Sequence, residues 1–314
     1  MVRLQKRNPI AMKDFSKTLI RCSALGQIMT GTKGKSNLDK YNDKLLELQQ
    51  EQEKYDAMPK KELKSAINKA EKIEKVKLEL VELEQKKDVI ELSDTCKTHL
   101  VQSYIFEKYG RVKDITTKEM KKGILVEDNS IQLFSIVDGN LYQKNEERIK
   151  NDFIIGTPDL YDGEDIYSCN EIIDIKSSWD IFTFLSNVEE ELPDTYYWQL
   201  MGYMALTGAK IGTIAYCLTN TPEEIVLQEK YNLLRNMNVV TEEDIKYKKE
   251  VEKLERNRYF DDIPIEERVL TISIDRNEDD IQKIYQRVEK CREFLAEFEQ
   301  EHLYFSKHHR KKLA

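Results

Sequence analysis

Two acidic residues and a lysine follow apolar segments in the middle of the chain. Asp159 comes after a segment that begins at Ile154, and Asp174 comes after a second one, with Lys176 two residues further on. Side chains at positions i and i+2 of a strand point to the same face, about 6.5 Å apart along the chain. If the two segments pair as strands, the carboxylates converge, which is costly unless they share a cation. Mg²⁺ is the natural candidate, because it binds one or two carboxylates together with waters and substrate phosphate.

A lysine beside such a cation has a chemical use of its own. The ammonium of Lys176 would be a compact positive charge that can steady a hydroxide nucleophile or the charge that develops on a phosphate. The same Asp-x-Lys pattern also fits the surface of a half-exposed strand with an ordinary salt bridge. The pattern alone does not distinguish these two interpretations.

Two further patterns flank this one. Gly123 lies four residues before Glu127 in a helix expected at about 116–129, where the glycine would clear space on the face that carries the glutamate. Gln199 and Tyr203 stand at i and i+4 of another expected helix and share one face, so Gln199 could orient a water or a phosphate with Tyr203 behind it. Each pattern alone is equally explained by a solvated helix or by packing.

The elements that must position these residues alternate between helices and strands. We expect helices at about 94–109, 116–129, 193–208 and 277–301, two more after Thr221 and Thr241, and strands at 131–139, 141–149, 152–162, 170–178, 210–220 and 269–274. Asp138, Gly139 and Asn140 carry the signal for a hairpin turn between the first two strands. This order predicts an α/β protein with a mixed central sheet flanked by helices.

Residues 39–92 have a different composition from the rest of the chain. They are rich in Lys, Glu, Leu and Gln, contain no glycine, and have Pro59 near the start of a second helical segment. Lys and Glu are interleaved, without the one-sided basic face of a DNA clamp. We interpret the segment as an inserted, coiled-coil-like helical hairpin that serves as a partner or self-association surface. The remaining organisation is then an N-terminal part of the core at 1–38, the main core at 93–305 and a basic tail at 306–314.

Composition limits the possible functions. The 314 residues include 34% charged residues, and no run approaches the roughly 18 apolar residues of a membrane span or the apolar region of a secretory signal. The five cysteines are scattered without a CxxC spacing, which argues against a zinc knuckle or an iron–sulfur cluster and favours free thiols in a reducing cytoplasm. The net charge of −8 argues against a protein that coats nucleic acid, but Arg3 to Lys35 is a basic region in which Asp14 is the single acidic residue.

Taken in order, G-x-x-x-E, G-x-P-D, D-x-K and Q-x-x-x-Y resemble the motifs of the PD-(D/E)XK nuclease superfamily. The pattern is most similar to its phage-type alkaline exonucleases, the phage lambda exonuclease and YqaJ-like recombinase nucleases. The resemblance covers about 94–220 and reaches "LIRCSALGQIMTG" near the N-terminus. It implies a restriction-endonuclease-like core. Asp174 stands where the lambda-type enzymes have glutamate.

The resemblance also implies roles for individual residues. The metal ligands would be Asp159, Asp174 and the backbone carbonyl of Ile175, with Glu127 completing the shell directly or through water. Asp128, beside Glu127, is the alternative. The catalytic group would be Lys176, with Gln199 helping to hold the lysine or the water and Tyr203 behind it. Ser23, accompanied by Arg21, would lie near the terminal phosphate of DNA.

The activity implied by the resemblance is that of a Mg²⁺-dependent deoxyribonuclease, with two ions expected and Mn²⁺ able to substitute. The favoured form is a 5′→3′ exonuclease on linear duplex DNA that serves phage-type recombination. It would act as a homo-oligomer in the bacterial cytoplasm, with a single-strand annealing protein as a further partner. Two alternatives stay open: a structure-specific endonuclease of the same fold, and a non-catalytic DNA-binding or scaffold protein that uses the helical hairpin.

Overall fold

The computed structural model describes residues 13–60, 63–113, 116–189 and 191–308. The chain forms two compact units, which are described separately below. The larger unit combines Met1–Gln27 with Gln102–Ala314, and the smaller one is Ile28–Val101. Of the predicted basic tail at 306–314, residues 309–314 lie outside the described residues.

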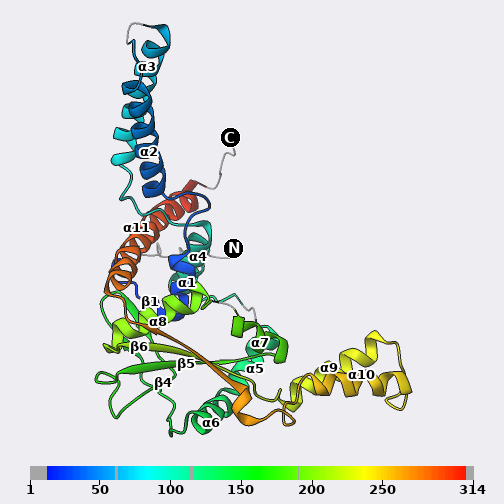
Figure 1. The fold of residues 1–314 in the computed structure, drawn as a ribbon. Coiled ribbons are helices and arrows are strands. Elements are labelled where there is room, and N and C mark those ends of the chain that lie inside the picture. Colours follow the sequence, from blue (N-terminus) through cyan, green and yellow to red (C-terminus); the bar gives the residue numbers. More distant parts are fainter. Residues whose placement is uncertain (1–12, 61–62, 114–115, 190, 309–314) are drawn as a thin grey trace, which may run out of the picture. The chain divides into compact units, whose positions relative to one another are not determined.

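The smaller unit contains an antiparallel pair of helices, α2 (Asn37–Asp56) and α3 (Lys64–Glu84) (Figure 1). Ser36 begins α2 with a capping box, in which its side chain and that of Asp39 each bond to the other residue's backbone N–H. Four side chains of α3 are buried: Ala66, Ile73, Val76 and Leu80. The assignment of this hairpin as an insertion stays a prediction.

The larger unit contains a four-stranded sheet with the order β4-β5-β6-β7. Its strands are β4 (Leu160–Tyr161), β5 (Glu171–Ser177), β6 (Ile211–Cys217) and β7 (Val269–Asp275). The central pair, β5 and β6, is parallel, and both outer pairings are antiparallel. A second, three-stranded sheet has the order β1-β3-β2, with β1 at Ile20–Arg21, β2 at Ile149–Lys150 and β3 at Ile154–Gly156. The predicted α/β class with a mixed sheet is confirmed.

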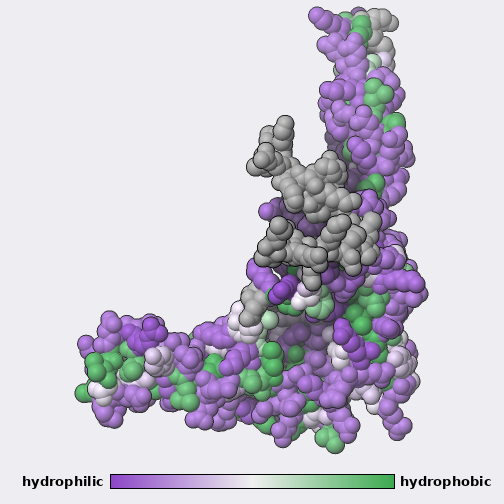
Figure 2. All heavy atoms as spheres, turned by 180° about the vertical axis from the view of Figure 1, so that it is seen from behind, coloured by the Kyte–Doolittle hydropathy of each residue, from purple (hydrophilic) through white to green (hydrophobic). Residues whose placement is uncertain are grey.

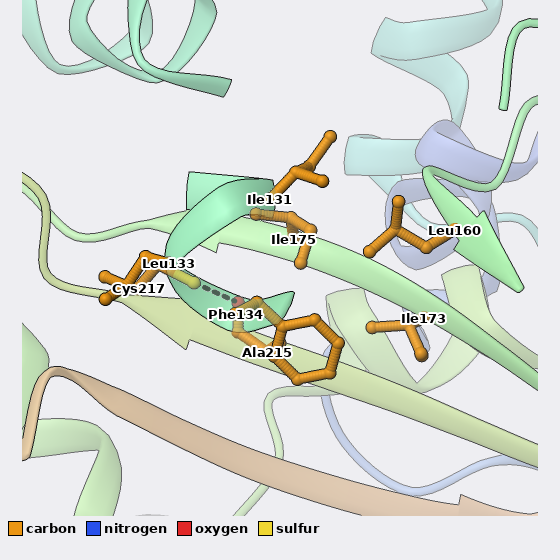
Figure 3. Packing of buried hydrophobic residues seen from close by; sticks show 8 residues of the cluster. All are labelled: Ile131, Leu133, Phe134, Leu160, Ile173, Ile175, Ala215 and Cys217. Atoms are coloured by element: carbon orange, nitrogen blue, oxygen red, sulfur yellow. Dashed lines mark hydrogen bonds between the residues drawn. The ribbon is translucent and has the colours of Figure 1, made fainter. Parts of the chain in front are cut away.

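Helices cover both faces of the four-stranded sheet. The helices of this unit include α5 (Lys118–Leu125), α6 (Glu127–Asp138), α7 (Ile181–Glu189), α8 (Asp194–Thr207), α9 (Glu223–Asn236), α10 (Ile245–Arg256) and α11 (Glu278–His308), and α4 (Asp94–Tyr109) begins in the smaller unit. Ile131 and Phe134 of α6 pack with Ile173 and Ile175 of β5 on one face (Figure 3). Helix α8 lies on the other face, which carries Asp174. None of the described helices combines the length and the apolar character needed to cross a membrane.

The prediction of strands at 131–139 and 141–149 is wrong. Residues 131–138 belong to α6, because the buried side chains Ile131 and Phe134 have the three-residue spacing of a helix face. Gly139 ends this helix in the left-handed conformation, with φ of 80°, and so acts as a helix cap rather than as a hairpin turn. Within 141–149, Ile149 alone belongs to a strand.

The helix expected at 116–129 and the strand expected at 152–162 are both interrupted. The helix breaks at Val126, where α5 ends and α6 begins. The strand divides into β3 and β4, which belong to different sheets. Pro158 lies in the gap and has no N–H with which to continue a ladder of hydrogen bonds. This break releases the chain from one sheet and delivers Asp159 to the edge of the other.

Candidate active site

The two acidic residues meet across β4 and β5. The antiparallel register pairs Leu160 with Ile173, so the preceding residue, Asp159, lies opposite Asp174. Oδ2 of Asp159 accepts a hydrogen bond of 2.7 Å from the backbone N–H of Ile175. Asp174 is 1% exposed, on the face opposite to Ile173 and Ile175. The predicted convergence of the two carboxylates is therefore present in the structure.

Burial and mutual repulsion disfavour the ionised form of these two carboxyl groups. Burial, together with the charge of Asp174, raises the pKa of Asp159 to about 7, against the opposing hydrogen bond from Ile175. Burial also raises the pKa of Asp174, even though the charge of Lys176 acts in the other direction. A bound cation would relieve both effects, since it favours the charged form of each carboxyl group.

Lys176 lies on the same side of β5 as Asp174 and forms an ion pair with its Oδ2. Burial by itself would lower the pKa of Lys176, but the neighbouring carboxylate of Asp174 outweighs it and raises the pKa. The ammonium also lies 5.0 Å from the ring centroid of Tyr196 on α8, a residue that the sequence analysis did not single out. The lysine is thus held in its charged form between a carboxylate and an aromatic face.

Helix α8 contributes the side chain that fixes the second oxygen of Asp174. Nε2 of Gln199 donates to Oδ1 of Asp174 at 2.9 Å and to the hydroxyl of Tyr203 at 3.1 Å. Both Gln199 and Tyr203 are buried. The expected shared face of these two residues is present, and Gln199 bonds to the carboxylate rather than to the lysine.

Two glycines let α8 pack closely against its neighbours: Gly202 of α8 faces the N-terminal segment, and Gly156 of β3 faces α8. A Cβ atom on Gly202 would lie 2.4 Å from Cδ1 of Leu25, and one on Gly156 would lie 2.6 Å from the ring of Tyr203. Leu25 is fully buried and has little room to move. By contrast, a Cβ on Gly123 of α5 would have no atom within 4 Å, so the predicted role of Gly123 in clearing space is wrong.

Replacement by alanine should therefore change the free energy of unfolding in opposite directions at Gly202 of α8 and at Gly123 of α5. Gly202→Ala should lower the free energy of unfolding by about 1–3 kcal/mol through overpacking. Gly123→Ala should raise it by about 0.5–1 kcal/mol, because alanine is the better helix former where space is open. Urea denaturation of both variants and the wild type measures these changes. Equal effects of the two substitutions would contradict the close approach of α8.

The third acidic residue stands at the edge of this site. Glu127 begins α6, and its side chain is 33% exposed and forms an ion pair of 2.7 Å with Lys144. Its charge contributes to the raised pKa of Asp159 and of Asp174. Asp128, the alternative ligand, is 89% exposed. The contact of Lys144 with Glu127 is not predicted from the sequence, because Lys144 lies in the segment 141–149, which the sequence predicts to be a strand.

The donor set fits a hard cation. No three His, Cys, Asp or Glu side chains among the described residues form a group that could hold a metal by themselves. The carboxylates available to a cation are therefore the pair Asp159 and Asp174, and Ile175, whose backbone carbonyl was the further expected ligand, follows Asp174 in β5. Two carboxylates completed by a carbonyl and waters are typical of Mg²⁺, which keeps several waters when bound to protein. The repulsion within the pair is the observation that favours a cation at this place.

The two residues expected near a terminal phosphate are exposed on the three-stranded sheet side of this unit. Arg21 ends β1, and Ser23 lies in the short helix η1 (Cys22–Ala24) that follows. Strand β1 runs parallel to β3, with Arg21 opposite Ile155. Because β3 leads to Asp159, Arg21 lies on the strand adjacent to the one that precedes this carboxylate, and Ser23 lies in the turn of helix that directly follows that strand.

A buried lysine that the sequence analysis missed supports the chain after Lys176. Nζ of Lys122 on α5 donates to the carbonyl oxygens of Ser178 and Trp179 at 2.8 and 3.0 Å. The side chain is completely buried. It lies in a Lys-Lys-Gly stretch that looks like an exposed helix surface, so its sequence context gave no signal. Its contacts fix the direction in which the chain leaves β5.

Lys122 should also make stability depend on pH. Burial, and then the charge of Arg258, lowers its pKa from the ordinary value of 10.5 to about 7. Unfolding then takes up a proton between about pH 7 and pH 10, so stability should rise with pH across that window. The free energy of unfolding of the wild type, relative to Lys122→Met, should rise by about 1–2 kcal/mol from pH 7 to pH 9. Urea denaturation at both pH values tests this, with the exposed Lys121→Met as control. A pH slope unchanged by Lys122→Met would contradict it.

Comparison with solved structures gives a related fold. The chain is similar to the phage-related exonuclease from Haemophilus somnus 129PT, with a TM-score of 0.58 and 22% sequence identity over 91% of this chain and 96% of that chain. The alkaline exonuclease LHK-Exo from Laribacter hongkongensis gives a TM-score of 0.45 at 16% identity over 72% of this chain and 91% of that chain. LHK-Exo in complex with dAMP gives 0.43 at 17% identity over 70% and 87%. No protein-family model and no curated protein sequence matches the chain. At this level of identity the first likeness establishes the fold.

Proposed function

We propose that this protein is a metal-dependent deoxyribonuclease that degrades linear duplex DNA from the 5′ end. The observation that carries the proposal is the pair Asp159, which is partly buried, and Asp174, which is fully buried, with Lys176 in an ion pair with Asp174. An ordinary surface salt bridge would not need two repelling carboxylates inside the protein, whereas a site for a cation and a phosphate does. The fold shared with a phage-related exonuclease supports the same assignment.

The metal would be held by Asp159, Asp174 and the carbonyl of Ile175, with Glu127 joining directly or through water. When bound, Mg²⁺, or Mn²⁺ in its place, would supply positive charge to the scissile phosphate and lower the pKa of the attacking water. Two ions are part of the proposal. Glu127 would have to exchange its contact with Lys144 for such a role.

The chain's own groups have distinct tasks in this proposal. Lys176 places a fixed positive charge where negative charge develops during phosphodiester cleavage. Gln199 holds one oxygen of Asp174, and the N–H of Ile175 holds one oxygen of Asp159, so both carboxylates are oriented before any ligand arrives. Phage-type recombination, with a single-strand annealing protein as partner, is the proposed setting.

A comparison of linear and closed-circular DNA substrates tests this proposal. With Mg²⁺, the pure protein should degrade linear duplex DNA and leave closed-circular duplex DNA of the same sequence intact. Gel electrophoresis of both substrates, with and without EDTA, measures this. Cleavage of the circle would favour the endonuclease alternative, and cleavage of neither would favour the scaffold alternative.

The 5′ end should also matter. A 5′-phosphorylated duplex should be degraded faster than a 5′-hydroxyl duplex, because Ser23 and Arg21 are proposed to contact the terminal phosphate. Ser23→Ala combined with Arg21→Ala should remove that preference while cleavage persists. Equal rates on both ends with the wild type would contradict the roles of these two residues.

A further inference from the structure

Four basic side chains follow one face of α10. They are Lys246, Lys249, Lys253 and Arg256, spaced by three, four and three residues, and all four are exposed. This spacing places side chains on one side of a helix, and at 1.5 Å per residue the row is about 15 Å long. Tyr247, next to the first of them, is buried, so the row lies away from the packed side of the helix. These four residues are called the basic stripe below.

The hairpin of α9 and α10 is fastened to the chain just beyond β5. The guanidinium of Arg258, which follows α10, lies 4.5 Å from the ring centroid of Trp179. Its Nε donates to Glu229 of α9 at 2.7 Å, and Glu229 also forms an ion pair of 2.6 Å with Lys118 of α5. Trp179 is the third residue after Lys176. The basic stripe is therefore carried by a hairpin whose base contacts the segment that follows the strand of the candidate active site.

The cations of the basic stripe are poorly paired compared with the other cations of the same hairpin. Lys230, Lys248 and Arg258 each form an ion pair with a carboxylate. In the stripe, Lys253 is 3.9 Å from Glu250, and the other three cations form no ion pair with any residue that the structure describes. Like charges three and four residues apart on a helix repel each other. An anion along this face would relieve that repulsion.

Two glutamates mark the limits of the basic stripe. Glu250 and Glu252 each lie about 40° outside its sector of the helix, since successive residues turn by about 100°. The sector between them holds four positive charges and no negative one. Figure 2 shows that hydrophilic residues cover much of this hairpin. The hairpin of α2 and α3 differs, because its lysines pair with the glutamates that alternate with them.

The charge and the shape of the basic stripe fit the backbone of duplex DNA. A duplex carries one negative charge per about 1.7 Å of its axis, so a straight row of cations can contact several phosphates at once. Lysine and arginine are the usual side chains for such contacts. The stripe itself has no aromatic residue on which unpaired bases could stack, which favours a duplex over a single strand.

We propose that the basic stripe of α10 binds the phosphate backbone of duplex DNA, without regard to sequence and outside the metal site. The inference rests on the proposed deoxyribonuclease function, because it takes the substrate of that function as the occupant of this surface. It adds a second place of contact, which holds the duplex by charge while the metal site acts on one phosphodiester.

Duplex binding by the full-length protein should become weaker and less sensitive to salt when the stripe loses its charge. The triple variant Lys246→Gln, Lys249→Gln and Lys253→Gln removes three charges but keeps good helix formers. EDTA prevents the proposed metal-dependent cleavage during the measurement. The Kd for a labelled blunt duplex should rise about tenfold or more, and the slope of log Kd against log salt should fall by about 2 to 3. Fluorescence anisotropy over a salt series measures both quantities.

Two further variants show whether the effect belongs to the charge of this face. Lys248→Gln removes a charge of the same helix that lies off the stripe and is paired with Glu243, so Kd should stay within about twofold. The variant Lys246→Arg, Lys249→Arg and Lys253→Arg keeps the charges and should bind at least as tightly as the wild type. An unchanged salt slope in the triple glutamine variant, an equal loss with Lys248→Gln, or loss of binding in the arginine variant would overturn the proposal.

Vesicles of phosphatidylserine test a lipid surface as the occupant instead. Vesicle binding that the triple glutamine variant loses, with its DNA binding unchanged, would overturn the proposal. The outcome is also distinguishable from failure of the proposed function. A protein that cleaves DNA with Mg²⁺ but shows no change of salt slope would refute the basic stripe alone, whereas the expected change of slope without any cleavage would refute the nuclease and support the DNA contact.

Discussion

Turnover of linear duplex DNA is expected to fall by at least 100-fold, about 2.7 kcal/mol of barrier, when Lys176 is replaced by methionine. Methionine keeps much of the apolar stem but removes the charge that is proposed to act on the transition state. Such a charge contributes little to ground-state affinity, so binding of DNA and of Mg²⁺ should persist. Single-turnover cleavage and a DNA-binding titration separate the two quantities.

Lys230→Met is the matched control for this experiment. The Lys230 side chain is 25% exposed, as is that of Lys176, and it too forms an ion pair with a carboxylate, Glu255. Loss of this remote pair should leave turnover within about twofold of the wild type, because a partly exposed pair contributes little. If Lys176→Met retained more than about a tenth of wild-type turnover, the lysine would be structural, since the lost barrier would be under about 1.4 kcal/mol.

The second large effect is expected for Asp159→Asn, which should abolish cleavage and remove metal-induced stabilisation together. The amide oxygen can still accept the hydrogen bond from Ile175, while the negative charge that repels Asp174 is gone. The metal-free variant should therefore be at least as stable as the wild type. Thermal melts should show that Mg²⁺ or Mn²⁺ raises the Tm of the wild type, by linkage to binding, but not that of the variant.

Asp128→Asn provides the comparison for the carboxylates. Asp128 is exposed to solvent and lies next to Glu127, so its substitution should change neither cleavage nor the metal-induced rise in Tm. A metal-induced rise of equal size in wild type and Asp159→Asn would remove Asp159 from the ligand set. Loss of the rise with Asp128→Asn would instead move the third ligand from Glu127 to Asp128.

What could be predicted from the sequence depended on local periodicity. The two-residue alternation of Asp174 and Lys176 with Ile173 and Ile175 fixed the faces of β5, because side chains alternate along every strand. The four-residue spacing of Gln199 and Tyr203 likewise fixed a shared helix face. Both interpretations required only the geometry of one element and agree with the structure.

The errors arose where tertiary context overrode local preference. Residues 131–138 are rich in β-branched and aromatic side chains and read as a strand, yet they form α6 because the sheet offers an apolar face for a helix. Lys144 and Lys122 bond to residues far away in the chain, and no local pattern reveals such contacts. The break at Pro158 could be expected from its missing N–H, but not the change of sheet that follows.

The short length of β4 has a spectroscopic consequence. Because this strand begins only at Leu160, the side chain of the preceding residue, Asp159, takes the place of a backbone acceptor for the N–H of Ile175. That single amide proton is therefore bonded to a group of the site itself rather than to the sheet. In an amide correlation NMR spectrum its resonance should move when the carboxylate changes partner, while those of other β5 amides stay nearly fixed. The amide resonance of Ile175 in the isotope-labelled protein therefore reports changes in the bonding of Asp159. No substitution in the chain is needed.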